Sequence, residues 1–128
     1  MTDYYKELLI SEIGARMPFG VKFKHFIWDE ELGEIEIASE IYSINRDGYI
    51  RAEVDYEEIH IDMVQLYLFP ISSMSKSQLD SFLSTCNIDG QNAFWTEKTY
   101  KWLNKYHFDY RKLIDQGLAL DATELNIY

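Results

Sequence analysis

The sequence contains a single cysteine, Cys86, among its 128 residues. One thiol cannot form an intramolecular disulfide, and the usual structural zinc sites built from several cysteines are excluded by the same count. The six glycines are scattered singly, so the chain holds neither a phosphate-binding loop nor a dinucleotide fingerprint. The sequence therefore predicts a protein of a reducing compartment that uses no cofactor.

Long hydrophobic runs and basic residues are also scarce. The longest apolar stretch, residues 63–71, is far too short to span a bilayer. The first residues lack the basic segment followed by a continuous apolar one that is typical of a signal peptide. Twelve Lys and Arg face 22 Asp and Glu, which gives a net charge of −10. This charge repels phosphate backbones and anionic lipid, so we expect a cytoplasmic protein with no direct nucleic-acid or membrane contact.

Hydrophobic residues, by contrast, make up 47% of the chain and include ten Tyr, seven Phe and three Trp. A chain of this length buries roughly two thirds of its unfolded surface around one core. No internal repeat or linker interrupts it, so residues 1–128 are predicted to form a single domain. The acidity is typical of a soluble surface, and it also fits a surface that engages a basic protein.

Two periodicities organise the first part of the chain. Apolar residues at helical spacing follow Thr2, a good helix cap, and predict a helix up to Gly14. From Val21 the period becomes two, which predicts strands over residues 21–28 and 34–41 with a turn between them. Folded as a hairpin, the strands oppose four residue pairs: Ile27 with Ile35, His25 with Ile37, Val21 with Ile41 and Lys22 with Glu40.

The remaining elements complete an α+β fold. A tight turn at residues 45–48 precedes a third strand, whose buried side is predicted to carry Ile50, Ala52, Val54 and Tyr56. A fourth strand is expected over residues 64–70, with residues 57–63 extending the third strand or forming a bulged connection. Ser75 and Gln78 form a capping box before a short helix, and a last helix starts at Asn92 or Thr96. We therefore predict an N-terminal helix, an antiparallel meander of three to four strands, and two C-terminal helices packed on the sheet.

The outer face of this meander is a candidate interaction surface. It carries two aromatic residues beside carboxylates, namely Phe26 and Trp28 with Glu34, Glu36, Glu40, Glu53 and Asp55. If a helix covers that end of the sheet, the aromatic side chains belong to the core. If none does, they form an apolar patch with an acidic rim, which is typical of an interaction site.

A second set of residues carries acid–base chemistry. His107, Asp109 and Arg111 lie within five positions and are candidates for a catalytic site. The competing interpretation is structural, with His107 near the negative end of a helix and Asp109 paired with Arg111. The histidines at 25, 60 and 107 show no tight metal-ligand spacing, so the sequence predicts no metal site.

Four segments carry a resemblance, and they are residues 15–21 (ARMPFGV), 70–75 (PISSMS), 102–111 (WLNKYHFDYR) and 117–120 (GLAL). In their order and in their residues they resemble segments of small uncharacterised proteins of Bacteroides phages, prophages and related mobile elements. This chain departs from the pattern at Phe69, Tyr106 and Lys112. The resemblance implies a phage or mobile-element setting and carries no activity across.

These observations predict a small acidic accessory protein that acts through a protein partner rather than through catalysis. Two alternatives stay open. One is a small enzyme that uses His107, Asp109 and Arg111, and the other is an inhibitor of a host nucleic-acid or defence enzyme that acts through the acidic face.

Overall fold

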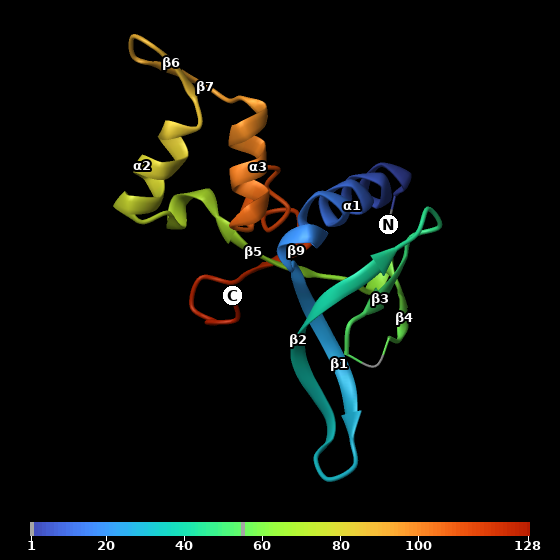
Figure 1. Ribbon diagram of the computed structural model, residues 1–128. Coiled ribbons are helices and arrows are strands. Elements are labelled where there is room, and N and C mark those ends of the chain that lie inside the picture. The colour runs from blue at the N-terminus through green and yellow to red at the C-terminus, as the bar shows by residue number, and fades with distance from the viewer. Residues whose placement is uncertain (1, 55) are drawn as a thin grey trace.

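The computed structural model describes residues 2–54 and 56–128, and within these ranges the chain forms three α-helices and nine strands (Figure 1). The helices are α1 (Asp3–Arg16), α2 (Lys76–Ser84) and α3 (Glu97–Lys105). The strands are β1 (Lys22–Asp29), β2 (Gly33–Ile44), β3 (Tyr49–Ala52), β4 (Glu58–His60), β5 (Leu66–Pro70), β6 (Asn87–Asp89), β7 (Asn92–Phe94), β8 (Phe108–Asp109) and β9 (Ala119–Asp121). Three 3-10 segments lie at Met17–Phe19, Ile61–Met63 and Ile71–Ser73. The α+β class and the N-terminal helix are confirmed.

Helix α1 begins as its sequence predicts, because the hydroxyl of Thr2 accepts the N–H of Tyr5 at 3.3 Å. It runs two residues beyond Gly14 and gives way at Met17 to the 3-10 segment that holds Pro18. One face of α1 enters the main core, whose buried residues are Leu8, Leu9, Ile13, Val21, Phe23, Ile41, Ile50, Ala52, Ile61, Val64, Leu66, Leu68, Leu113 and Ala119. The helix is therefore anchored by apolar packing on the sheet.

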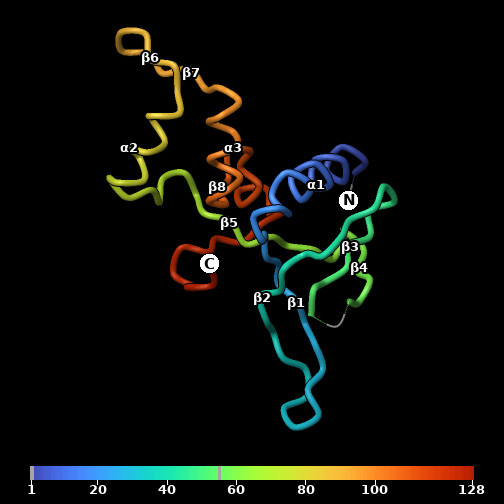
Figure 2. The backbone as a smooth tube through the Cα atoms, viewed as in Figure 1, coloured from blue at the N-terminus to red at the C-terminus, as the bar shows by residue number. Residues whose placement is uncertain are grey.

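The β1–β2 hairpin has the predicted register, with Ile27 opposite Ile35 and Lys22 opposite Glu40. Its turn is held by Asp29, whose carboxylate accepts the N–H groups of Glu31 and Leu32 at 2.8 and 2.9 Å. These bonds lower the pKa of Asp29. The turn end of the hairpin projects away from the helices (Figures 1 and 2).

The sheet is larger than predicted and it is mixed. In the described part of the chain, seven strands join in the order β4-β3-β2-β1-β5-β8, with β9 also paired to β5. The predicted fourth strand, β5, pairs antiparallel with β1 at Phe23 and parallel with β8 and β9. The expectation of a simple antiparallel meander is therefore corrected. Strand β4 occupies part of the stretch between residues 57 and 63.

The predicted third strand is too long. It ends at Ala52, and the chain then turns, with Tyr56 at a positive φ of 53°. Val54 and Tyr56, which we expected to be buried, are 45% and 54% exposed because they have left the sheet. Asp55 lies outside the described residues.

Helices α2 and α3 contact each other and surround Phe108 at the end of the sheet instead of covering its face. They form a second core of Phe82, Leu103 and Phe108, to which Phe69 and Trp102 add partly buried rings. The capping box of Ser75 and Gln78 opens α2, as predicted. Between the helices, β6 and β7 form a separate hairpin that we did not predict. Among the described helices, none combines the length and apolar composition needed to cross a bilayer.

Candidate interaction surface

The two aromatic residues on the outer face of β1 are exposed. Trp28 is 75% and Phe26 is 51% accessible, whereas Phe23, on the inner face of the same strand, is 1% accessible. Side chains alternate between the two faces of a strand, so one strand supplies both a core residue and two surface rings. Of the two alternatives that the sequence leaves open, the structure therefore shows the exposed patch.

Strand pairing brings carboxylates next to these rings. Trp28 lies opposite Glu34, and Phe26 lies opposite Glu36. Directly opposite residues on one face of an antiparallel pair have side chains close enough to act together. We use the name acidic–aromatic face for Phe26, Trp28, Glu34, Glu36 and Glu40.

Lys24 shows how a cation fits this face. Its Nζ lies 2.9 Å from a carboxylate oxygen of Glu36 and 5.4 Å from the centre of the Phe26 ring. The hydrogen bond to Glu36 raises the pKa of Lys24 above its ordinary value. One ammonium group is thus held by a carboxylate and by a ring face together, as in a cation–π contact.

One further carboxylate, that of Glu53 after β3, belongs to a residue that bonds β2 near its far end. Glu40 lies opposite Lys22, and the N–H of Glu53 donates to the carbonyl of Glu40 at 3.0 Å. The structure therefore brings Glu53 beside Glu40. Asp55, the remaining member predicted for this surface, cannot be placed because it falls outside the described residues.

The negative charge is concentrated in this part of the chain. Residues 29–58 contain eleven Asp and Glu against two Arg, a net charge of −9, out of −10 for the whole protein. This stretch runs from the hairpin turn through β2 and β3 into β4. A local field of one sign attracts partners of the opposite sign.

His107 lies apart from this face, at the end of α3. It has a positive φ of 62°, its ring stacks on that of Tyr128 at 4.0 Å, and it is 5% exposed. Burial, with a smaller contribution from the charge of Arg16, lowers the pKa of His107 to about 4. Burial thus opposes the charged form of His107, which is the form that the expected interaction with the helix dipole favours.

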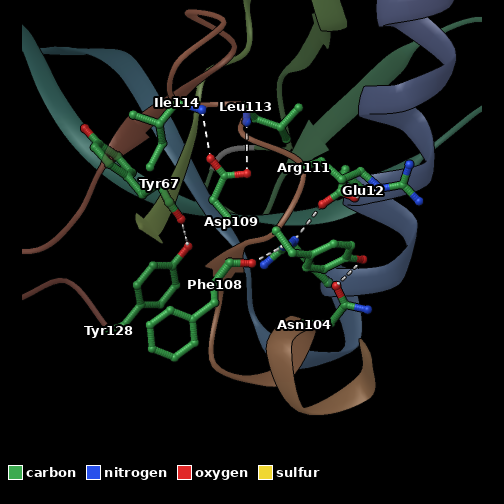
Figure 3. A network of polar contacts seen from close by, with 11 residues as sticks. Glu12, Tyr67, Asn104, Phe108, Asp109, Arg111, Leu113, Ile114 and Tyr128 are labelled. Carbon is green, nitrogen blue, oxygen red and sulfur yellow. Dashed lines mark hydrogen bonds and ion pairs between the residues drawn. The ribbon is translucent and has the colours of Figure 1, made fainter. Parts of the chain in front are cut away.

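Asp109 and Arg111 make separate structural contacts (Figure 3). The carboxylate of Asp109 accepts the N–H groups of Leu113 and Ile114, each at 2.9 Å. Nε of Arg111 instead lies 2.8 Å from the carboxylate of Glu12, so the predicted local pairing of Asp109 with Arg111 is wrong.

The three catalytic candidates do not line a common pocket. His107 borders a cavity of about 510 Å³ together with Lys22, and Asp109 borders another of about 260 Å³. Each candidate thus has its own structural contacts, and the structure does not gather the three around one reacting position.

The other two histidines also have protein partners. Nδ1 of the buried His25 lies 2.9 Å from the hydroxyl of Ser39, and Nδ1 of His60 accepts the N–H of Asp62 at 3.2 Å. Both border one pocket of about 290 Å³, which His107 does not reach. Across residues 2–54 and 56–128, no group of three or more His, Cys, Asp or Glu side chains is placed to hold a metal ion.

Sequence reasoning missed several exposed apolar residues. Leu32 at the hairpin turn is 74% exposed, and Tyr42 packs edge-on against Tyr56 at 5.0 Å with both rings open to solvent. Tyr42 continues the alternation of Glu34 to Glu40 and was therefore predictable as an outer residue. The β6–β7 hairpin exposes Ile88 and Phe94, and its Asp89-Gly90 pair is the local signal that could have revealed the turn.

Comparisons with protein-family models, with curated proteins and with solved structures found no match for this chain.

Proposed function

We propose that this protein is a small, non-enzymatic interaction module that binds a basic partner protein through the acidic–aromatic face. The observation that carries the proposal is the exposure of Trp28 directly opposite Glu34 on a projecting hairpin. Trp, with Tyr and Arg, is enriched at the energetic centres of protein interfaces, and a surrounding polar rim is the usual arrangement.

The charge distribution supports a basic partner. Residues 29–58 carry a net charge of −9, and Lys22 and Lys24 of the facing strand bring it to −7 over residues 22–58. This part of the protein therefore repels acidic surfaces and accelerates encounter with basic ones. The Lys24 contact with Glu36 and Phe26 demonstrates the chemistry that a partner lysine or arginine would repeat. The phage or mobile-element setting, which the resemblance of four sequence segments implies, and a cytoplasmic location belong to this proposal.

A narrower form of the same function is inhibition of a host nucleic-acid or defence enzyme. It is favoured by the three carboxylates on the outer face of β2, Glu34, Glu36 and Glu40, because side chains at alternate positions of a strand lie about 7 Å apart on one face. A row of negative charges of this kind competes for basic grooves that bind phosphate backbones.

The test is capture of a partner by immobilised protein from a Bacteroides extract, with variants that keep the fold. We expect basic proteins to be retained by the wild type and lost with Trp28→Ala and with the pair Glu34→Lys and Glu36→Lys. The control is the pair Asp80→Lys and Asp89→Lys, which changes the net charge equally but lies on α2 and β6. Equal loss with both pairs, or no loss with either, would contradict the proposal.

A further inference from the structure

The backbone N–H and C=O groups of successive residues in β1 point alternately toward β2 and toward the opposite edge of the strand. Val21 faces β2, because its carbonyl accepts the N–H of Ile41 at 3.3 Å. Lys22 and Lys24 face the other way, since their N–H groups donate to the Tyr128 hydroxyl at 2.8 Å and to the Gln65 carbonyl at 3.0 Å. In an antiparallel ladder this alternation continues along the strand. The N–H and C=O groups of Phe26 and Trp28 therefore point away from β2 as well.

No described strand borders that side of β1 beyond Lys24. Strand β5 pairs with β1 at Phe23 and then continues toward β8 and β9, in the opposite direction from Trp28. The two residues with exposed rings thus also present an open backbone edge. Such an edge is a template for pairing with another extended chain.

Across this edge lies a groove of about 290 Å³ between β1 and β4. It is lined by residues 23–26 of β1, by residues 57–60 around β4, and by Met63. The carbonyl of Glu57 accepts the N–H of Ala52, and the N–H of Ile61 donates to the carbonyl of Gly48. The backbone groups of these two residues, which flank β4, therefore point toward β3. Glu58 and His60 lie between them and direct their backbone groups to the outer edge of β4.

The chemistry of the surroundings selects the kind of segment that fits. Side chains on the outer face of an added strand would lie beside Trp28 and Phe26. A long basic side chain there would reach Glu34, and it would share Glu36 with Lys24. Lys24 already makes this combination of contacts within the chain. Side chains on the inner face would enter the groove, where Phe23, Ile59 and Met63 offer apolar contacts beside ionisable residues such as Glu58 and His60.

We propose that an extended segment of a basic partner protein adds as a strand to the open edge of β1 at Phe26 and Trp28. Basic side chains of the segment alternate with apolar ones, the basic set on the acidic–aromatic face and the apolar set in the groove. About five residues, spanning roughly 17 Å, cover the edge. This inference rests on the proposed function and specifies its binding mode.

Backbone pairing is tested by amide hydrogen exchange, measured by NMR on the full chain. The probe is a synthetic peptide of alternating lysine and valine with blocked ends, added to saturation. We expect exchange of the Phe26 and Trp28 amides to slow by about tenfold or more. The amides of Phe23 and His25 face β2 and serve as an internal control that should not change.

Two N-methylated peptides separate backbone pairing from charge attraction. One carries methyl groups on the lysine amides and the other on the valine amides, and the charge is the same in both. Only one set of amides can face β1, so one peptide should lose at least about tenfold in affinity while the other binds as the parent does.

The outcomes distinguish this inference from the function on which it rests. Binding that requires Glu34 and Glu36 but tolerates both methylated peptides overturns strand addition and leaves the interaction surface intact. Binding unaffected by Trp28→Ala and by the double charge reversal overturns the proposed function. A peptide that fails to bind also overturns strand addition by a basic partner. Protection of the Phe26 and Trp28 amides that rises with protein concentration, without peptide, overturns it too, because a second copy of the chain would then pair with this edge.

Discussion

Glu12 and Arg16 form an ion pair that is removed from solvent: Nε of Arg16 lies 3.0 Å from Oε2 of Glu12, and the two side chains are 0% and 2% exposed. The same guanidinium donates to the carbonyl of Phe108 at 2.6 Å and lies over the ring of Tyr110. The pair therefore joins one turn of α1 to the start of β8, and Arg111 adds a second cation to Glu12 from the surface side.

Removing one member of this pair should be costly. Glu12→Ala leaves the buried guanidinium of Arg16 without its carboxylate, and we expect the free energy of unfolding to fall by about 3–5 kcal/mol. The double variant Glu12→Leu with Arg16→Met should lose less than the single variant, because no uncompensated buried charge remains and Arg111, which also loses its partner, is half-exposed. Urea denaturation measures both. The control is Glu58→Ala, which breaks a half-exposed pair with Arg51 and should cost about 1 kcal/mol or less. Equal losses for Glu12→Ala and Glu58→Ala would refute this interpretation.

The sequence predicted those features that depend on neighbouring residues. The Thr2 cap, the Ser75 capping box and the β1–β2 register each follow from side chains a few positions apart or from two alternating patterns that must match. The strands β8 and β9 were missed because they hold two and three residues and pair with β5 across a long sequence separation. Segments this short show no periodicity.

The candidate surface was predictable only in part. Alternation placed Phe26 and Trp28 on one face with Glu34 and Glu36, and the structure confirms that grouping. Whether a helix covers them depends on where α2 and α3 pack. These helices pack around Phe108 at the end of the sheet. This packing depends on contacts between distant segments, so no local sequence pattern predicts it.

The hydroxyl of Tyr128 bridges two strands where their own pairing is minimal. It accepts the N–H of Lys22 at 2.8 Å and donates to the carbonyl of Tyr67 at 2.7 Å. Tyr128→Phe leaves these two backbone groups without that partner, so we expect a loss of about 1–3 kcal/mol in unfolding free energy. The Lys22 amide should also exchange faster. Tyr106→Phe, at a ring that is 43% exposed, is the control and should have little effect on stability. Identical stabilities of the two variants would show that the bridge contributes nothing.

His107 should make the stability of the protein depend on pH. Its pKa is about 4 in the folded state against 6.5 for an ordinary histidine, so between these values the unfolded chain binds the additional proton. Stability should therefore rise with pH from about 4 to 6.5 and level off above, by up to about 3 kcal/mol.

The measurement is the difference in unfolding free energy between wild type and His107→Asn across this pH range, since Asn tolerates a positive φ. Taking the difference cancels the contribution to stability of the carboxylates that titrate in the same pH range. His60→Gln, at a partly exposed site, is the matched control. A difference that does not vary with pH would mean that His107 titrates normally in the folded protein.

Phe23 and Trp28 lie on opposite faces of β1 and should respond differently to truncation. Phe23→Ala opens a cavity in the main core and should cost about 3–5 kcal/mol. Trp28→Ala removes a ring that is already 75% exposed, so we expect a change within about 0.5 kcal/mol. Unfolding in urea at two protein concentrations measures both and reveals any self-association. A large loss for Trp28→Ala at low concentration would mean that the ring supports the fold, and the exposed aromatic centre of the proposed interaction surface would then not exist in solution.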